Sequence, residues 1–244
     1  MNKVVAFIPA RIGSSRLPRK HFRKIGDRCL LDWVIKRAKD CPLIDEVVVC
    51  FPQKEEGYRD FIAYCDSRAV SGFNFSGDII DVVGRLTAAS VEYSADISLL
   101  LSGDCPLLCE MRLETLLNGL LTNPDCRMTR FKDRDGIPHI MQGYRVDRSD
   151  LWDEANNVSF SEYDREHQFP ILNFDRKETP DKRPLLLEAC DEDYSIIGDI
   201  SVNTGDDVAH MNFIYETLSA KGLKFNLSNA RDLIYSCTPA NQEI

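Results

Sequence analysis

Strand-like apolar runs alternate with helix-like stretches along the first half of the chain, and this alternation constrains the fold more than any other feature. The runs at 4–10, 47–49 and 97–101 are short and almost continuously apolar, as in strands that are buried on both faces. Between the first two runs, helical spacing places one apolar face at Leu30, Leu31, Val34, Ile35 and Ala38. Such alternation predicts βαβ units around a mainly parallel sheet.

Further elements continue this pattern. Helical periodicity indicates a second helix at about 55–67, a third at about 79–93 and a fourth at 110–121. Later in the chain, a strand is predicted over 199–203. It leads into a helix whose N-cap is Thr204, because threonine is a favoured residue at that position.

The pattern loosens between about 127 and 184. Four of the eleven prolines lie there, and only short strand candidates stand out, at 139–141 and 170–172. A chain of 244 residues with 43% apolar residues is long enough for one large α/β domain. We therefore expect a single domain over 1–244, with 127–184 as a dimerisation or acceptor-binding extension.

Charge and hydropathy indicate which kinds of partner the protein can bind and in which compartment it is found. The net charge of −9 argues against a nucleic-acid polymer, since polymer binding usually needs a broad basic surface. The apolar run 4–8 is far shorter than a signal h-region or a membrane span, and no small-residue cleavage site follows it. The sequence is typical of a cytoplasmic protein that does not enter a membrane.

The nine cysteines form an odd set without CxxC pairs, and several lie in apolar runs. This favours reduced thiols in the core over disulfides or a zinc site. Cys105 and Cys109 are four residues apart, and a nucleophilic role is the alternative for them. No histidine is adjacent to either, which makes that role a poor candidate.

A basic loop follows the first strand, at the edge where a parallel sheet presents ligand-binding loops. Between residues 11 and 24 there is no acid, and the basic residues are Arg11, Arg16, Arg19, Lys20, Arg23 and Lys24. In an acidic protein this clustering indicates a polyanion site. Gly13 would allow close approach to a phosphate, and Ser14 and Ser15 could donate to it. A solvated basic loop is the alternative, and neither GxGxxG nor GxxxxGK[ST] is present.

The strand at 97–101 ends at Ser102, Gly103 and Asp104. A carboxylate at such a strand end can ligate a hard cation such as Mg²⁺, which makes Asp104 the candidate metal ligand. The alternative is an aspartate that caps a turn or helix before Pro106.

The residues at 9–20 (PARIGSSRLPRK) resemble the nucleotide-binding signature of the cytidylyltransferases that activate acidic sugars. In the 3-deoxy-manno-octulosonate and spore-coat-polysaccharide branches this loop reads approximately PAR-x-x-S-[ST]-R-L-P-x-K. Further segments resemble spore-coat motifs in the same order: 81–85 (DVVGR), 101–107 (LSGDCPL), 165–167 (REH) and 201–207 (SVNTGDD). The likeness spans roughly residues 3–218, and five ordered motifs are a more specific signal than any one of them.

The resemblance implies a three-layer, Rossmann-like α/β fold of the nucleotide-diphospho-sugar transferase type, and a dimer formed through the extension. It implies that a hydroxyl of an anionic sugar, of the 2-keto-3-deoxy or nonulosonate type, attacks the α-phosphate of CTP and releases pyrophosphate. Arg11, Arg16 and Lys20 would be the catalytic cations that hold the triphosphate. The implied nucleotide site comprises Pro9, Ala10, Arg11, Gly13, Ser14, Ser15, Arg16, Lys20, Arg85, Ser102 and Gly103.

For the metal and the acceptor, the resemblance implies two smaller sets of residues. Mg²⁺ would be bound by Asp104 and Asn203. Glu166 and His167 would contact the acceptor sugar, with a surface or subunit-interface position as the alternative.

Three positions depart from the family pattern. Asn203 stands where the family has aspartate, which predicts a weaker metal site, although an amide oxygen can still bind Mg²⁺. Gly84 replaces an aspartate, which removes a local partner for Arg85, and Gly205 replaces a proline.

Two other classes of function therefore stay open. One is a nucleotidyltransferase or glycosyltransferase that uses another nucleotide, although a glycosyltransferase would be expected to show a DxD-like motif at the strand end. The other is a catalytically weakened nucleotide-binding protein. The sequence does not identify the acceptor sugar.

Overall fold

The computed structural model describes residues 2–135, 144–158, 161–167, 184–194, 196 and 200–234. Its centre is a seven-stranded sheet with the strand order β5-β4-β1-β6-β8-β7-β9. The strands are β1 (Val4–Pro9), β4 (Glu46–Pro52), β5 (Ser71–Phe75), β6 (Ile97–Leu100), β7 (Met128–Phe131), β8 (Arg145–Arg148) and β9 (Leu185–Leu187). Neighbouring strands from β5 to β6 are parallel, β8 is antiparallel to β6 and β7, and β9 is parallel to β7.

Alternating side chains of each strand pack into two hydrophobic cores, one on either face of the sheet. On β1, Ala6 and Ile8 belong to one core, and Val5 and Phe7 belong to the other. The first core is covered by α1 (Leu30–Asp40), α2 (Arg59–Arg68), α4 (Glu110–Thr122), α9 (Gly205–Ala220) and α10 (Leu227–Ile234). The second is covered by α3 (Val82–Glu92) and α5 (Asp150–Val158).

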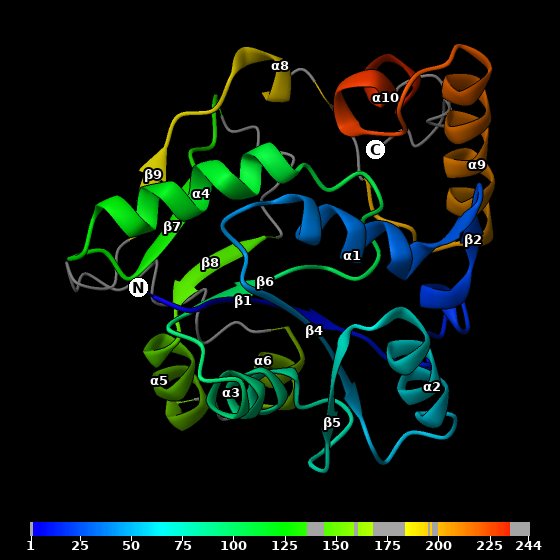
Figure 1. Cartoon of the computed structure of the whole chain (residues 1–244). Helices are drawn as coiled ribbons and strands as arrows, with labels where there is room; N and C mark the ends of the chain where they lie inside the picture. The colour runs from blue at the N-terminus through cyan, green and yellow to red at the C-terminus, as the bar shows by residue number, and fades with distance from the viewer. Residues whose placement is uncertain are drawn as a thin grey trace.

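Figure 1 shows these layers, with α1 and α4 on one side of the sheet and α3, α5 and α6 (Glu162–His167) on the other. The remaining elements are the hairpin β2 (Lys24–Ile25) and β3 (Arg28–Cys29), the 3₁₀ turn η1 (Lys20–Phe22) and the short helix α8 (Asp191–Tyr194). The predicted three-layer α/β architecture with a mainly parallel sheet is confirmed.

Several predicted elements are confirmed close to their expected bounds. The first strand, the first helix and its apolar face all agree, because the five predicted core residues of α1 are buried. The predicted N-cap of α9 is also confirmed. Thr204 accepts a hydrogen bond from the Asp207 amide, and the Asp207 side chain accepts one from the Thr204 amide, so the two form a capping box.

Other predicted bounds were wrong. Helix α2 begins at Arg59 rather than near 55, since Gly57 has a φ of 84° that is incompatible with a continuous helix. Helix α3 begins at Val82, where Asp81 supplies the N-cap by accepting from the Gly84 amide. Of the strand predicted over 199–203, the described residues 200–203 are not a strand.

The predicted extension over 127–184 is described in part. Within it, β7 and β8 continue the sheet beyond β6. The strand candidates at 139–141 and 170–172 lie outside the described residues. The role of this region in dimerisation stays a prediction.

In the described part of the chain, no helix combines the length and apolarity that a membrane crossing requires. The described cysteines carry free thiols. Five of them are buried, in agreement with the predicted core role: Cys41, Cys50, Cys65, Cys105 and Cys109.

Candidate active site

A cavity of about 340 Å³ lies at the carboxyl ends of β1 and β6 and is lined by most of the predicted site residues. These residues are Pro9, Ala10, Arg11, Arg16, Lys20, Arg85, Ser102, Gly103, Asp104, Glu166, His167 and Asn203. The remaining wall is formed by His21, Ile79, Val82 and Leu100. Parallel sheets bind ligands at this edge, and the chain brings together there five segments that are distant in sequence.

The centre of the cavity holds an ion pair between Lys20 and Asp104. Lys20 begins η1, and its Nζ lies 2.5 Å from Asp104 Oδ2, while Ser102 Oγ donates to Asp104 Oδ1 at 2.5 Å. Burial raises the pKa of Asp104, but the Lys20 charge and the hydrogen bonds from Lys20 and Ser102 outweigh it and lower that pKa below its ordinary value of 3.8. Asp104 is therefore ionised at neutral pH.

A second cation of the basic loop reaches the other predicted metal ligand. Arg16 Nη2 donates to Asn203 Oδ1 at 3.1 Å. The backbone joins the two ligand segments, since the Val202 amide donates to the Asp104 carbonyl at 2.8 Å. The segment predicted as a strand thus lies beside the loop after β6 and brings Asn203 to the cavity.

The chemistry of Asp104 and Asn203 fits a magnesium ion that is held partly by its substrate. Mg²⁺ in nucleotide-using sites is bound by one or two carboxylates together with phosphate oxygens and water. Asp104 supplies a carboxylate, Asn203 supplies a neutral oxygen, and both line the same cavity. Among the residues that the structure describes, there is no group of three or more His, Cys, Asp and Glu side chains placed to hold a metal without a substrate.

Arg85 lies at the floor of the cavity, with 2% of its surface exposed. Its Nη1 donates to the Ala10 carbonyl at 3.4 Å and its Nη2 to the Ile79 carbonyl at 2.5 Å. Burial lowers the pKa of this guanidinium. These carbonyls supply the partners of Arg85, so the glycine at position 84 does not leave its guanidinium without hydrogen bonds.

Gly13, Ser14 and Ser15 were predicted to bind the nucleotide, and they are not among the residues that line the cavity. The Glu55 carboxylate occupies the backbone donors here, because Ile12 N–H and Gly13 N–H donate to its two oxygens, each at 2.6 Å. A Cβ on Gly13 would lie 2.9 Å from Glu55 Oε1, so the glycine gives this carboxylate room. That these three residues contact phosphate stays a prediction.

Sequence reasoning missed Glu55 and His21. Glu55 was assigned to a helix, and only its position in the loop after β4, facing the loop after β1, could have indicated its role. His21 is buried against the cavity, with Nδ1 3.2 Å from the Gly103 carbonyl. Burial is the main reason that its pKa falls from 6.5 to about 4. The sequence signal for His21 was its position directly after Lys20 in the basic loop.

The short helix α6 forms a second wall of the cavity, next to the basic loop. It carries Glu166 and His167 to the cavity, and Glu166 Oε1 lies 3.2 Å from Arg11 Nη1 across it. The cations that line the cavity, Arg11, Arg16, Lys20 and Arg85, outnumber the acids Asp104 and Glu166. A protein with a net charge of −9 therefore has a locally cationic cavity, which can bind a polyanion together with a divalent cation.

Comparison with known proteins identifies the family of this chain. Residues 5–193 match the model of the family described as Cytidylyltransferase. An uncharacterised protein of Methanocaldococcus jannaschii is 31% identical over 172 residues, which are 70% of this chain and 67% of that protein. The 3-deoxy-manno-octulosonate cytidylyltransferase of Escherichia coli is 33% identical over 126 residues, and the one of Koribacter versatilis is 33% identical over 115 residues. The matched residues cover 51% and 47% of this chain, but only 48% and 42% of those two enzymes.

Solved structures extend the likeness over the whole fold. A cytidylyltransferase from Leptospira borgpetersenii superposes with a TM-score of 0.77 at 22% identity, covering 99% of this chain and 100% of that one. A CMP:2-keto-3-deoxy-manno-octonic acid synthetase in complex with CTP gives 0.64 at 20% identity, covering 91% and 100%. At such low identities the superpositions establish the fold alone, whereas the family match covers most of the chain. The protein therefore belongs to the cytidylyltransferase family and is an enzyme of the nucleotidyltransferase class.

Proposed function

We propose that this protein transfers CMP from CTP to an anionic sugar of the 2-keto-3-deoxy or nonulosonate type and releases pyrophosphate. The observation that carries the proposal is the cationic cavity, where the basic-loop side chains of Arg16 and Lys20 meet Asn203 and Asp104. This arrangement suits a reaction in which negative charge gathers on a leaving polyphosphate. The names of the similar enzymes support the choice of nucleotide and of acceptor.

In the mechanism that we propose, Arg11, Arg16 and Lys20 bind the triphosphate and neutralise the charge that develops on the departing pyrophosphate. Arg85 and the 102–103 loop bind the nucleoside, and Glu166 and His167 orient the acceptor. The sugar hydroxyl then attacks the α-phosphate from a position set by the cavity walls. The rate enhancement comes from position and electrostatics, and no covalent enzyme intermediate is needed.

Mg²⁺ is the proposed cofactor, with Asp104 and Asn203 as its protein ligands. When bound, it would screen the phosphate charges and polarise their oxygens. Lys20 and Arg16 pair with these two residues, so the same cations can move to the phosphates as the nucleotide enters. We also propose a cytoplasmic homodimer that supplies activated sugar for polysaccharide synthesis, with 127–184 as its interface.

The test is pyrophosphate release from CTP and Mg²⁺ with a panel of 2-keto-3-deoxy and nonulosonate sugar acids. We expect release only when CTP and one of the acids are both present. CTP binding without turnover on any acid would support the alternative of a weakened nucleotide-binding protein. CTP, UTP, ATP and GTP should then be compared, and an equal or higher rate with another nucleotide would reject cytidylyl transfer while keeping nucleotidyl transfer.

A further inference from the structure

Helix α6 contributes two side chains to the cavity although it packs no buried residue into the core. All six of its residues are described, and none is buried. A helix this short is not stable by propensity alone, so its position depends on contacts with the rest of the protein. The ion pair between Glu166 and Arg11 is a modest anchor, since both side chains are more than 30% exposed and solvent screens them.

Arg165 contacts two neighbouring helices at once. Its Nε donates to Asp81 Oδ1 at 2.8 Å and its Nη2 to Asp81 Oδ2 at 2.9 Å, which is a two-point ion pair. Nη2 also donates to Asn156 Oδ1 at 2.6 Å, and Nη1 donates to the Asn156 carbonyl at 3.3 Å. Asp81 precedes α3 and Asn156 lies in α5, so one guanidinium joins α6 to both. Its fork geometry fixes orientation as well as distance.

Asp81, the acidic partner in this ion pair, is held in place at the start of α3. Asp81 Oδ1 accepts from the Gly84 amide as the N-cap of the helix. A Cβ at Gly84 would lie 2.3 Å from Asp81 Oδ2 and 3.0 Å from Arg165 Nη2. The glycine that departs from the family pattern is therefore what leaves room for the ion pair in this chain.

We propose that Arg165 is a positioning residue, which holds α6 against α3 through Asp81 and thereby sets Glu166 and His167 at the acceptor side of the cavity. Arg165 does not itself line the cavity. The acceptor part of this inference rests on the proposed function. The anchoring part rests on the contacts alone and can be tested without turnover.

Anchoring is measured by hydrogen–deuterium exchange of the α6 amides in the ligand-free protein. Arg165→Gln breaks the pair, and Asp81→Asn removes its charge while keeping a good N-cap for α3. Both should speed α6 exchange at least about threefold, because the lost charge-assisted bonds no longer oppose local opening. Unchanged exchange in both variants would overturn the anchoring, whether or not the protein transfers CMP.

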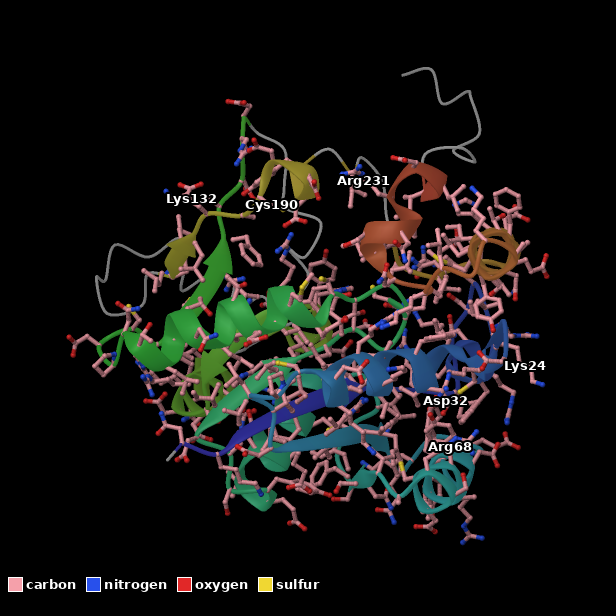
Figure 2. The ribbon with its side chains drawn as sticks, turned by 45° about the horizontal axis from the view of Figure 1, so that its top comes forward. Lys24, Asp32, Arg68, Lys132, Cys190 and Arg231 are labelled. Carbon is pink, nitrogen blue, oxygen red and sulfur yellow. The ribbon has the colours of Figure 1, made fainter. Side chains whose placement is uncertain are left out.

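The matched control is Arg68→Gln. Arg68 Nε donates to Asp32 Oδ1 at 2.9 Å and Nη2 to Asp32 Oδ2 at 3.4 Å, so this is also a two-point pair between side chains of different helices. Figure 2 shows the pair on α1 and α2, and neither residue lines the cavity. Its loss should leave α6 exchange and activity unchanged. Faster α6 exchange in this control would mean that any lost ion pair loosens α6, which would overturn the specific role of Arg165.

The acceptor role is measured by kinetics with 3-deoxy-manno-octulosonate at saturating CTP. Arg165→Gln should raise the KM of this acceptor at least about tenfold while the Kd of CTP changes less than about twofold, and Arg165→Lys should recover part of the loss. His167→Ala should have a similar effect, and the double variant should be little worse than His167→Ala alone. Equal losses for CTP and acceptor, or fully additive effects, would overturn positioning at the acceptor side. If the wild-type protein turns over no acceptor, the proposed function fails while the exchange result still decides the anchoring.

Discussion

The two walls of the cavity are held in different ways. The basic loop is fixed by its own backbone: two of its amides bind Glu55, the Arg19 amide donates to the Ile12 carbonyl at 3.0 Å, and Arg19 pairs with Asp60 at 2.8 Å. His21 ties the end of this loop to the Gly103 carbonyl. The wall formed by α6 has no buried residue, and Arg165 bonds both Asp81 at the start of α3 and Asn156 in α5.

This difference predicts which part of the site tolerates substitution. A loop with several independent anchors keeps its shape when one is lost, because the remaining bonds still define the backbone. A short helix without buried residues depends more on each of its contacts, so the loss of the Arg165 guanidinium, which joins α6 to two neighbours, can shift it. We therefore expect substitutions of anchoring residues to be mild in the basic loop and severe at α6, whereas substitutions of the lining side chains are severe on either wall.

The largest effect is expected at Asp104, which lies between the walls and is the proposed carboxylate ligand of Mg²⁺. Asp104→Ala should lower CTP turnover at least about a hundredfold, and Asn203→Asp should instead lower the Mg²⁺ concentration for half-maximal rate. Activity is measured against Mg²⁺ concentration at fixed CTP, with Asp66→Ala as control, because Asp66 is exposed and lies outside the cavity. An unchanged curve for Asp104→Ala would put the metal elsewhere.

The next largest effect is expected from Lys20→Met within the basic loop. One charge-assisted contact with the triphosphate is worth roughly 1.5–3 kcal/mol, so the kcat/KM for CTP should fall at least about tenfold. The control is Arg23→Met, because Arg23 belongs to the same basic loop but is exposed and lies outside the cavity. Equal losses in both variants would mean that the loop acts through its total charge rather than through the residues that line the cavity.

The fold was largely predictable from sequence because the buried faces of its helices and strands require apolar residues at regular spacing. The continuous apolar runs of β1 and β6 and the apolar face of α1 follow from packing on both sides of a parallel sheet. Strand β5 carries Ser71 and Asn74 at the sheet edge, and β7 carries Arg130, so neither run is continuously apolar and both were missed. Their positions depend on partners distant in sequence.

The candidate site was predictable as a set of residues but not as a set of pairs. Motif order placed Lys20, Asp104 and Asn203 in one site, and the structure brings all three to one cavity. The structure pairs Lys20 with Asp104 and Arg165 with Asp81. These pairs depend on distances across the fold, which spacing along the chain does not encode. Glu55 was missed for the same reason, because its partners are backbone amides of another loop.

The His21 anchor predicts a pH dependence of stability for the ligand-free protein. Its folded pKa of about 4 lies below its ordinary value of 6.5, so protonation opposes folding. The contribution of neutral His21 to the free energy of unfolding is nearly complete above pH 6.5 and is lost as the pH drops towards 4. The free energy of unfolding should therefore fall by about 2 kcal/mol between pH 7.5 and 5. The carboxylates Asp32, Glu46, Asp104 and Glu188 also have lowered pKa values, and they lose their contributions to stability only as the pH falls below their ordinary values of 3.8 to 4.5.

Urea unfolding at the two pH values measures this difference, with His21→Phe as the comparison. The variant should be less stable at pH 7.5, because the Gly103 carbonyl loses its partner, and it should show a smaller change between pH 7.5 and 5. An equal pH dependence in both proteins would show that His21 does not stay neutral in the folded state. Equal stability of the two proteins at pH 7.5 would remove His21 from the anchors of the basic loop and weaken the comparison of the two walls.

The smallest effect is expected from Glu55→Gln, which tests the redundancy of the basic loop directly. Glutamine keeps one acceptor for the Ile12 and Gly13 amides but turns an NH₂ group towards the other, so one of the two bonds is lost. Because the Arg19 and His21 contacts remain, the KM for CTP should rise only about two- to fivefold, with kcat nearly unchanged. The neighbouring exposed Glu56→Gln is the control and should match the wild type. A loss as large as that of Lys20→Met, without a fall in thermal stability, would show that the loop depends on a single side chain as α6 does, and the contrast between the two walls would be wrong.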